Sequence, residues 1–265
     1  MKQIRVSLKD KPYTICAGSP LSRIGSAFRE LSEGKISKVL VVTQPFAKKH
    51  FLPQMLRSLK SAGLNIAVAI VPDGEKYKTL DTVHKLYREC IRHGLDRSSC
   101  IIALGGGVTG DMAGFAAATY LRGIRLVHVP TTLLAMVDSS IGGKTGVDLP
   151  ESKNSVGAFY QPALVWIDPS LLKTLPTREW RNGMAEVIKY GVISDAKLFA
   201  LLERTDIFSK PADSPFWADV IARCAGIKAL VVSQDEKETR GVRETLNFGH
   251  TLGHAIESVT GYKVY

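Results

Sequence analysis

Short apolar runs alternate with longer amphipathic stretches up to about residue 176, and this alternation restricts the possible folds more than any other feature. The runs have the length of buried strands, and the stretches between them have the apolar spacing of helices. Strands are predicted at residues 38–43, 66–71, 100–104, 126–129 and 163–169, after a β-hairpin at 4–15. Helices are predicted at 46–62 (interrupted at Pro53), 80–93 and 112–120. Alternating strands and helices predict an α/β domain with a parallel-rich sheet that is covered on both faces.

The character of the chain changes after Pro176, where no convincing strand remains. Apolar spacing predicts helices at residues 178–204, 216–234 and 247–259. We therefore expect an α/β domain over residues 1–176 and an all-helical domain over 177–265. The cleft between two such domains is a common place for a ligand site.

The charge and the apolar content limit the possible partners and the compartment. The formal net charge is +10, but the basic residues are dispersed and no basic run is interleaved with aromatic residues. A small polyanionic substrate is therefore expected, with neither nucleic acid nor membrane as a partner. No run of 18 apolar residues would span a bilayer, and the N-terminus lacks the apolar core of a signal peptide. We expect a cytoplasmic protein whose four scattered cysteines are reduced and mostly buried.

A glycine-rich turn at residues 105–111 follows a predicted strand and precedes a predicted helix. Glycines at such a junction let backbone amides approach a pyrophosphate beside the positive end of the helix. Taken alone the pattern is weak, and a plain tight turn explains it equally well. It differs from an ordinary dinucleotide fingerprint because no acid lies about 20 residues further on. Asp111 would repel a phosphate unless it faces a sugar, an amide or a cation.

Two histidines, His250 and His254, lie four residues apart in a predicted helix, so they share one face. That spacing allows both imidazoles to reach one metal ion or one anionic ligand, and Glu186 is a candidate third ligand. Without Glu186 and the neighbouring glycines, a pair of ordinary helix histidines would be the better interpretation.

Several segments together resemble the 3-dehydroquinate synthase family, in the family's order and over nearly the whole chain. They are the glycine turn, residues 129–148, Lys153-Asn154, residues 183–190 and residues 246–254. The resemblance implies a dehydroquinate synthase-like fold, a tightly bound NAD⁺, a divalent metal (zinc or cobalt) and a homodimer. It implies a lyase that converts 3-deoxy-arabino-heptulosonate 7-phosphate to 3-dehydroquinate and phosphate, in the shikimate pathway of aromatic amino acid biosynthesis. The hydride taken by NAD⁺ is returned, so no net oxidation occurs.

The resemblance also implies roles for individual residues. Those expected at the cofactor are Asp73, Glu75, Lys78, Gly107, Val108, Gly110, Asp111, Thr131, Thr132, Lys144, Lys153 and Thr174. Those expected in catalysis and substrate binding are Lys144, Asn154, Lys189, Arg243, Asn247, His254, Asp138, Lys228 and Arg122.

The resemblance also concerns the dimer interface, the metal ligands and one departure from the family. Arg122 resembles an arginine that the family lends across its dimer interface. Glu186 and His250 match the family's metal ligands, whereas His254 matches a position that orients the substrate. Gln44 departs from the acid or Asn that is frequent in the family after the first parallel strand.

Other interpretations of the same residues stay open. Without the resemblance, residues 73–78 would be interpreted as a charged turn, Thr131 and Thr132 as caps of a helix, and each lysine as a solvent-facing side chain. The family's third metal ligand, a histidine in a His-Gly-Glu motif, would fall just beyond Tyr265. We therefore expect a chain that is truncated relative to the family, with exposed apolar surface in its helical domain, weak metal binding and low activity. The rival functions are a metal-dependent polyol or alcohol dehydrogenase, a related sugar-phosphate cyclase, and a non-catalytic fragment of such a fold.

Overall fold

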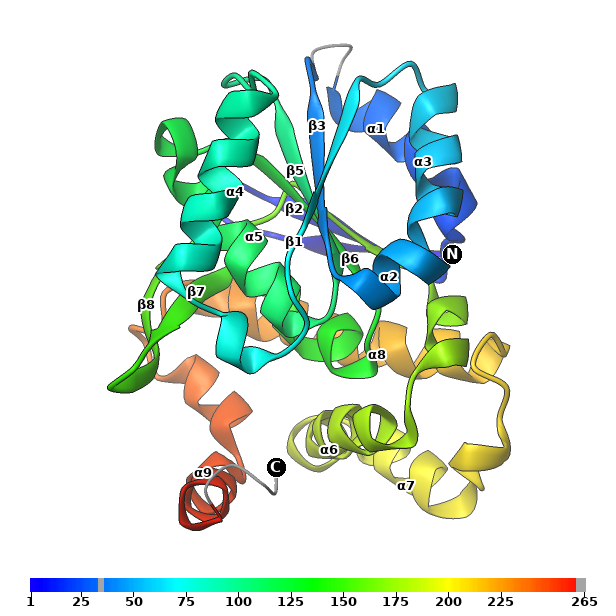
Figure 1. Cartoon of the computed structure of the whole chain (residues 1–265). Coiled ribbons are helices and arrows are strands. Elements are labelled where there is room, and N and C mark those ends of the chain that lie inside the picture. Colours follow the sequence, from blue (N-terminus) through cyan, green and yellow to red (C-terminus); the bar gives the residue numbers. More distant parts are fainter. Residues whose placement is uncertain (33–35, 261–265) are drawn as a thin grey trace.

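The computed structural model describes residues 1–32 and 36–260, without the side chains at positions 29, 30, 32, 208, 254, 257 and 258. Seven strands form the main sheet, in the order β1-β2-β9-β6-β5-β3-β4 (Figure 1). β1 and β2 are antiparallel, and all other neighbouring pairs are parallel. The strands are β1 (Lys2–Val6), β2 (Tyr13–Ala17), β3 (Val39–Thr43), β4 (Ile66–Ile70), β5 (Cys100–Gly105), β6 (Arg125–Pro130) and β9 (Leu164–Ile167). The predicted hairpin and parallel sheet are confirmed.

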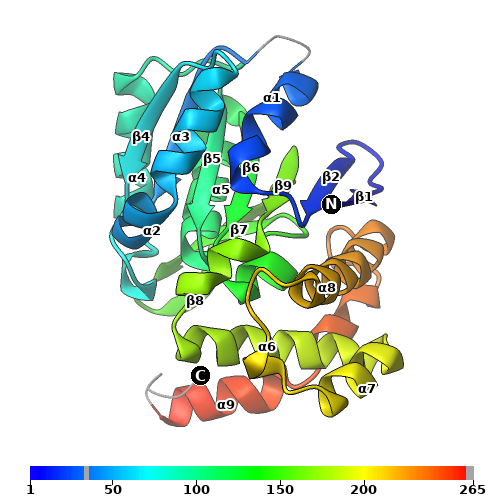
Figure 2. The same ribbon diagram turned by 90° about the vertical axis from the view of Figure 1, so that its right-hand side faces the viewer.

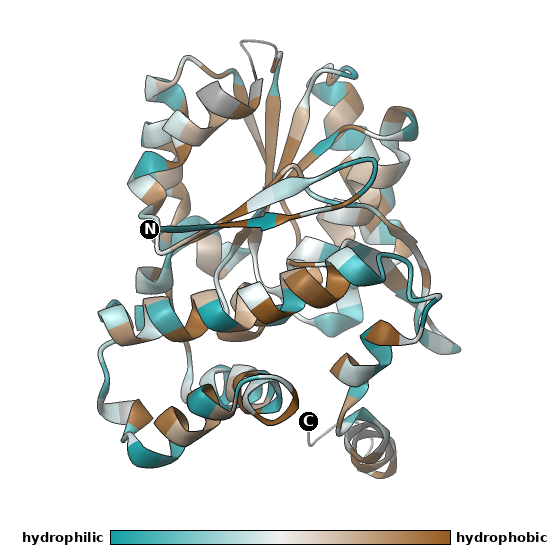
Figure 3. Ribbon diagram, turned by 180° about the vertical axis from the view of Figure 1, so that it is seen from behind, coloured by the Kyte–Doolittle hydropathy of each residue, from teal (hydrophilic) through white to brown (hydrophobic). Residues whose placement is uncertain are grey.

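Helices cover both faces of this sheet, as alternating strands and helices require (Figure 1). One face packs against α1 (Ile24–Ser32) and α3 (Leu52–Ser61), and the other against α4 (Leu80–Arg92) and α5 (Gly107–Thr119). The short helix α2 (Pro45–His50) follows β3 at the lower edge of the sheet. Figure 3 shows hydrophobic strands at the centre and helices whose hydropathy alternates along their length.

The remaining helices lie below the carboxyl edge of the sheet (Figures 1 and 2). They are α6 (Thr177–Ile193), α7 (Ala196–Arg204), α8 (Pro215–Gln234) and α9 (His250–Val259), with short 3-10 turns η6 (Ile207–Ser209) and η7 (Val242–Asn247). The predicted helix at 178–204 divides at Asp195, whose side chain accepts a hydrogen bond of 2.9 Å from the Leu198 amide and caps α7. Trp217 of α8 and Tyr190 of α6 belong to the same core as the strands. The division at residue 176 stays a prediction.

Three local predictions were wrong or incomplete. A second sheet, the antiparallel hairpin β7 (Lys144–Leu149) and β8 (Ser152–Phe159), was missed because β8 is polar and mostly exposed. Helix α5 begins at Gly107 and not at residue 112, because packing of its apolar side chains on the sheet overrides the low helix propensity of glycine. The break in the helix at 46–62 falls at Phe51, so that Pro53 lies in the first turn of α3, where its missing amide costs nothing.

Five further short helical segments connect these elements. They are η1 (Leu21–Arg23), η2 (Glu75–Tyr77) after β4, η3 (Tyr120–Arg122) after α5, the π-helical turn η4 (Ala135–Ser139) after β6, and η5 (Pro169–Thr174) after β9. Among the described residues, no helix combines the length and apolarity needed to cross a lipid bilayer.

Candidate active site

The site is built where β5 and β6 end, at the carboxyl edge of the sheet. The Thr131 amide donates a hydrogen bond of 2.9 Å to the Gly105 carbonyl oxygen, which joins the two strand ends. Helix α5 begins directly after Gly106, and no side chain caps it. Its first amides, at Gly107 and Val108, are therefore available to an anion at the positive end of the helix. Gly110 and Asp111 lie in the same first turns, inside the helix and not in a loop before it.

Helix α6 approaches this edge closely because residue 183 is glycine. A Cβ on Gly183 would lie 2.6 Å from the Leu133 Cβ and 2.7 Å from the Leu134 amide nitrogen, so a larger residue would push α6 away. This contact places α6 against the segment that leads into the π-helical turn η4. Turns of this kind occur often at functional sites. Within η4, Asp138 is the acid predicted to contact substrate.

Asp138 is the centre of a compact polar cluster. Its Oδ1 accepts hydrogen bonds from the Lys228 ammonium at 2.7 Å and from the Tyr190 hydroxyl at 2.8 Å. Lys228 also donates to the Asp138 carbonyl oxygen at 2.8 Å. Burial would raise the pKa of Asp138, but the Lys228 and Lys189 ammonium groups and these hydrogen bonds lower it to about 2. Asp138 is thus an ionised acceptor at neutral pH, and burial lowers the pKa of Lys228.

Glu186 and Lys189 face each other one turn apart on α6 and form an ion pair. Lys189 also donates to the Leu246 carbonyl oxygen at 2.7 Å, which attaches α6 to η7, the segment just before His250. Only 15% of the Glu186 side chain is exposed. Although Lys189 lies beside the Glu186 Oε2, no described donor has the geometry of a hydrogen bond to that oxygen. A buried carboxylate oxygen without a hydrogen bond suits a cation, and Lys189 attaches the same helix to Leu246, four residues before the His250 imidazole.

A second cluster joins the predicted cofactor residues. The Lys78 ammonium lies 2.6 Å from the Asp111 carboxylate and 3.9 Å from Glu75, and it donates to the Asn154 amide oxygen. Asp111 therefore faces a cation, one of the three partners that the sequence required. Burial raises the pKa of Asp111 to about 6 in spite of Lys78. Burial also raises the pKa values of Glu75 and Asp73.

A third group joins Lys144 and Arg243 through an acid that sequence reasoning missed. Glu238 lies 2.6 Å from the Lys144 ammonium and 3.2 Å from the Arg243 guanidinium nitrogen. The Arg243 side chain is buried and donates to the Glu236 carbonyl oxygen at 2.8 Å. Gly142, at φ +100°, leaves room for it, since a Cβ there would lie 2.9 Å from the guanidinium. Glu238 belongs to an Asp-Glu-Lys-Glu run that resembles solvated surface, so the sequence carried no signal for it.

Other predicted residues do not join these clusters. Asp73, Thr174 and Asn247 are exposed, and the Thr174 hydroxyl donates to the Leu171 carbonyl oxygen within its own turn. The Thr132 hydroxyl accepts a hydrogen bond from the Ala135 amide, so the helix-capping interpretation of Thr132 is confirmed. Lys153 is exposed and His250 is half-buried.

The structure does not test the predicted metal ligands, Glu186 and His250, nor the predicted substrate contact of His254. The side chain of His254 lies outside the described residues, so its role stays a prediction. Within the part of the chain that the structure describes, no group of three or more His, Cys, Asp or Glu side chains forms a metal site. The expected exposed apolar surface is present in and beside α9, at Phe248, Leu252, Ile256 and Val259.

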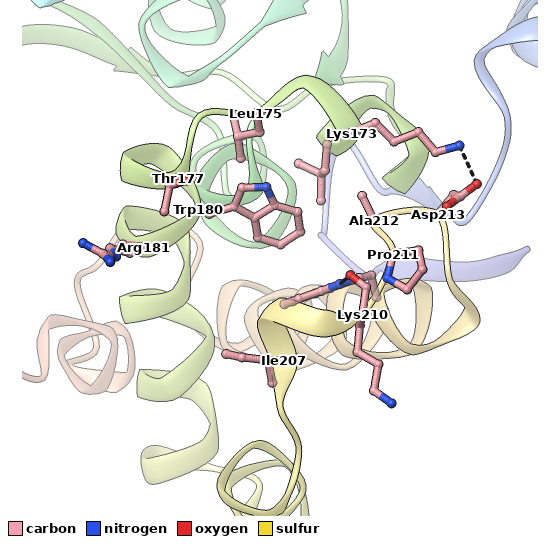
Figure 4. A pocket seen from close by; sticks show the side chains of 12 residues that line it. Lys173, Leu175, Thr177, Trp180, Arg181, Ile207, Lys210, Pro211, Ala212 and Asp213 are labelled. Carbon is pink, nitrogen blue, oxygen red and sulfur yellow. Dashed lines mark hydrogen bonds and ion pairs between the residues drawn. The ribbon is translucent and has the colours of Figure 1, made fainter.

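The structure has two pockets of note, one beside the predicted cofactor residues and one away from the predicted site. One, of about 670 Å³, is lined by Glu75 and Lys153 of the predicted cofactor set, together with Asp148. The other, of about 540 Å³, lies between the starts of α6 and α8, with Trp180 on one wall and a Lys173–Asp213 ion pair at the rim (Figure 4). None of the predicted site residues with described side chains lines this second pocket.

Sequence comparison decides the family. The 3-dehydroquinate synthase N-terminal model matches residues 68–182, and the C-terminal model of the same enzyme matches residues 183–265. The chain belongs to the 3-dehydroquinate synthase family. It is 54% identical to the 3-dehydroquinate synthase of Nostoc punctiforme, over 98% of this chain and 72% of that protein. It is 51% identical to that of Gloeobacter violaceus, over 100% of this chain and 73% of that protein. The predicted family is confirmed.

Solved structures agree with this membership in the 3-dehydroquinate synthase family. A 2-deoxy-scyllo-inosose synthase complexed with carbaglucose-6-phosphate, NAD⁺ and Co²⁺ has a TM-score of 0.86 and 30% identity, and the match covers 100% of this chain and 72% of that one. A 2-epi-5-epi-valiolone synthase from Streptomyces hygroscopicus with NAD⁺ and Zn²⁺ bound also has a TM-score of 0.86, at 29% identity over 98% of this chain and 71% of that one. A glycerol dehydrogenase from Schizosaccharomyces pombe, at 17% identity and a TM-score of 0.58, shares the fold alone. The predicted fold class is confirmed.

Proposed function

We propose that the chain converts 3-deoxy-arabino-heptulosonate 7-phosphate to 3-dehydroquinate and phosphate, with NAD⁺ and a divalent metal as cofactors. The observation that carries the proposal is the cluster of Lys189, Lys228, Asp138 and Glu186 next to the glycine turn, in a family member 54% identical to a named synthase. Clustered lysines suit a substrate that carries both a phosphate and a carboxylate, because each ammonium is a flexible point charge.

The cofactor would bind at the carboxyl edge of the sheet. The uncapped start of α5 offers amides for the pyrophosphate of NAD⁺, and Lys78 joins Asp111 of this helix to Glu75, which lines the pocket of about 670 Å³. Both related cyclases named above were solved with NAD⁺ bound. A dinucleotide in this position would lie beside the Lys78–Asp111 pair, which holds the side chain of Asn154.

Glu186 and His250 would hold the divalent metal, with oxygen and nitrogen donors that suit zinc. A bound divalent metal polarises a substrate hydroxyl and lowers its pKa. The protein groups bind and orient: Lys228 keeps Asp138 ionised, so that Asp138 accepts a hydrogen bond and does not supply a proton. Lys189 lies between Glu186 and the Leu246 carbonyl oxygen, where its charge can offset that of an anionic substrate. Fixing a flexible sugar acid in one pose is how such contacts lower the barriers of several steps.

We also propose that the enzyme acts as a homodimer in the cytoplasm. Arg122 follows the carboxyl end of α5, whereas the glycine turn is at the other end of this 13-residue helix. At 1.5 Å per residue these ends are roughly 20 Å apart, too far for Arg122 to serve the site of its own subunit. An exposed arginine in that place fits a role in a neighbouring subunit. The four cysteines are all buried, which fits reduced thiols in a reducing compartment.

The test is phosphate release from the heptulosonate phosphate by the chain with NAD⁺ and Zn²⁺. We expect phosphate without accumulation of NADH, because the hydride returns to the substrate. Lys189→Met should abolish release, whereas Lys173→Met, which removes an exposed lysine paired with Asp213, should not. Accumulating NADH without phosphate would instead indicate a polyol or alcohol dehydrogenase, and no turnover with saturating cofactors would indicate a non-catalytic fragment.

A further inference from the structure

Tyr190 is fully buried on α6, which packs against η4, α7 and α8. It directly follows Lys189 and comes one turn after Glu186. A buried tyrosine needs a partner for its hydroxyl, whereas phenylalanine would fill the same space without one. The partner of Tyr190 is the Asp138 carboxylate, 52 residues earlier in the chain.

The hydrogen bonds at Asp138 are distributed unevenly over its two oxygens. Oδ1 accepts from both Tyr190, at 2.8 Å, and Lys228, at 2.7 Å. The described residues give Oδ2 no hydrogen bond, and 26% of the side chain remains exposed. Two donors on one oxygen therefore fix the carboxylate plane and leave the other oxygen accessible to a ligand hydroxyl.

Lys228 alone does not provide that orientation. Its ammonium also bonds the Asp138 carbonyl oxygen, so it holds the backbone and the side chain of Asp138 from the α8 side. Tyr190 holds the same carboxylate from the α6 side. Burial and the Asp138 charge raise the pKa of Tyr190 well above its usual value, so the hydroxyl keeps its proton and remains a donor.

We propose that Tyr190 is a positioning residue, whose hydroxyl orients Asp138 so that its free oxygen accepts a hydroxyl of the substrate. This inference rests on the proposed function, because it assigns Asp138 to substrate binding. It also makes α6 a single unit, in which Glu186, Lys189 and Tyr190 fix the metal, the anionic substrate and the Asp138 carboxylate from one helix.

The test compares Tyr190→Phe with the wild type in the phosphate-release assay. A lost hydrogen bond to a charged group predicts a fall of about tenfold to a hundredfold in kcat/KM. NAD⁺ affinity should change by no more than about twofold, since the ring and the cofactor residues are untouched. Tyr87→Phe is the matched control: it removes a tyrosine hydroxyl that bonds Thr119 at 2.7 Å, between α4 and α5. It should leave kcat/KM unchanged.

A double variant separates positioning from mere stability. If Tyr190 acts through Asp138, Tyr190→Phe should slow Asp138→Asn by no more than about twofold. Additive losses in the double variant, wild-type kcat/KM in Tyr190→Phe, or failure of Tyr190→Phe to fold would each overturn the proposal. A wild-type chain that releases no phosphate with its cofactors refutes the proposed function itself, and this inference with it; the variants alone refute only the role of Tyr190.

Discussion

Asp111 makes the stability of the protein depend on pH in a direction that one substitution can isolate. Its side chain is only 24% exposed, and the Lys78 ammonium lies 2.6 Å from its carboxylate. Burial nevertheless outweighs the lysine and raises the pKa of Asp111 to about 6. An unfolded aspartate has a pKa of about 3.9, so the folded state binds this proton more tightly. The group therefore favours folding most below about pH 4, and that contribution is lost as the pH rises to about 6.

The magnitude follows from the difference of about two pKa units. At 1.36 kcal/mol per unit, the ionised carboxylate costs about 3 kcal/mol of folding free energy above about pH 6. Asp111→Asn cannot ionise. The unfolding free energy of the variant minus that of the wild type should therefore increase by about 2 kcal/mol between about pH 4 and pH 7. Lys78 stays protonated over this range and adds a constant that cancels from the slope.

The assay is urea unfolding, followed by circular dichroism at a series of pH values without added ligand, with linear extrapolation to water. Asp213→Asn is the control, because the exposed Asp213 carboxylate accepts a hydrogen bond from the Lys173 ammonium, which lowers the pKa of Asp213. Its difference curve should slope the opposite way. A flat curve for Asp111→Asn would refute the claim that burial governs this carboxyl, and a reversed slope would mean that the Lys78 ion pair dominates.

Three further predictions test the packing and the assembly. Lys228→Met removes the ion-pair partner of the Asp138 carboxylate and should cost about 3 kcal/mol of unfolding free energy at neutral pH, measured by urea unfolding. Gly183→Ala should cost about 1–3 kcal/mol because its Cβ meets Leu133 and the Leu134 backbone, whereas Gly226→Ala, whose Cβ meets no neighbouring element, should stabilise α8 by up to about 1 kcal/mol; equal effects would contradict the packing argument. If Arg122 serves the partner subunit, an equal mixture of inactive Arg122→Ala and Lys228→Met chains, allowed to exchange subunits, should recover about a quarter of wild-type activity, and no recovery would place Arg122 in its own site.

The sheet could be predicted from the sequence because its parallel strands are buried on both faces and therefore read as continuous apolar runs. The hairpin β7–β8 could not, because its exposed second strand, from Ser152 to Phe159, has the polar composition of a loop. The start of α5 was placed too late for a similar reason. Glycine propensity argues against a helix there, and only contact with the sheet stabilises it.

The candidate site also has a part that could be predicted from the sequence and a part that could not. Residues inside motifs, such as Glu186 and Lys189, could be named from the sequence because the family resemblance marks them. Their partners could not be, because the pairs join distant segments: Tyr190 with Asp138, and Glu238 with both Lys144 and Arg243. A single sequence states which residues are polar and does not state which polar groups share a buried space.

The π-helical turn η4 explains why so many of these partners meet at one place. A residue inserted into a helix rotates the following side chains by about 100°, so neighbouring residues leave such a turn in different directions. Asp138 points to Tyr190 and Lys228, on α6 and α8. Ser139 lies on the other side, with its Oγ 3.1 Å from the place of a Cβ on Gly107, at the start of α5. That buried Ser139 hydroxyl has no hydrogen-bond partner among the described residues. One five-residue segment thus contacts both α5, whose first amides we propose for the cofactor, and α6, which carries Glu186, so η4 and the Gly183 contact behind it fix how these two helices lie relative to each other.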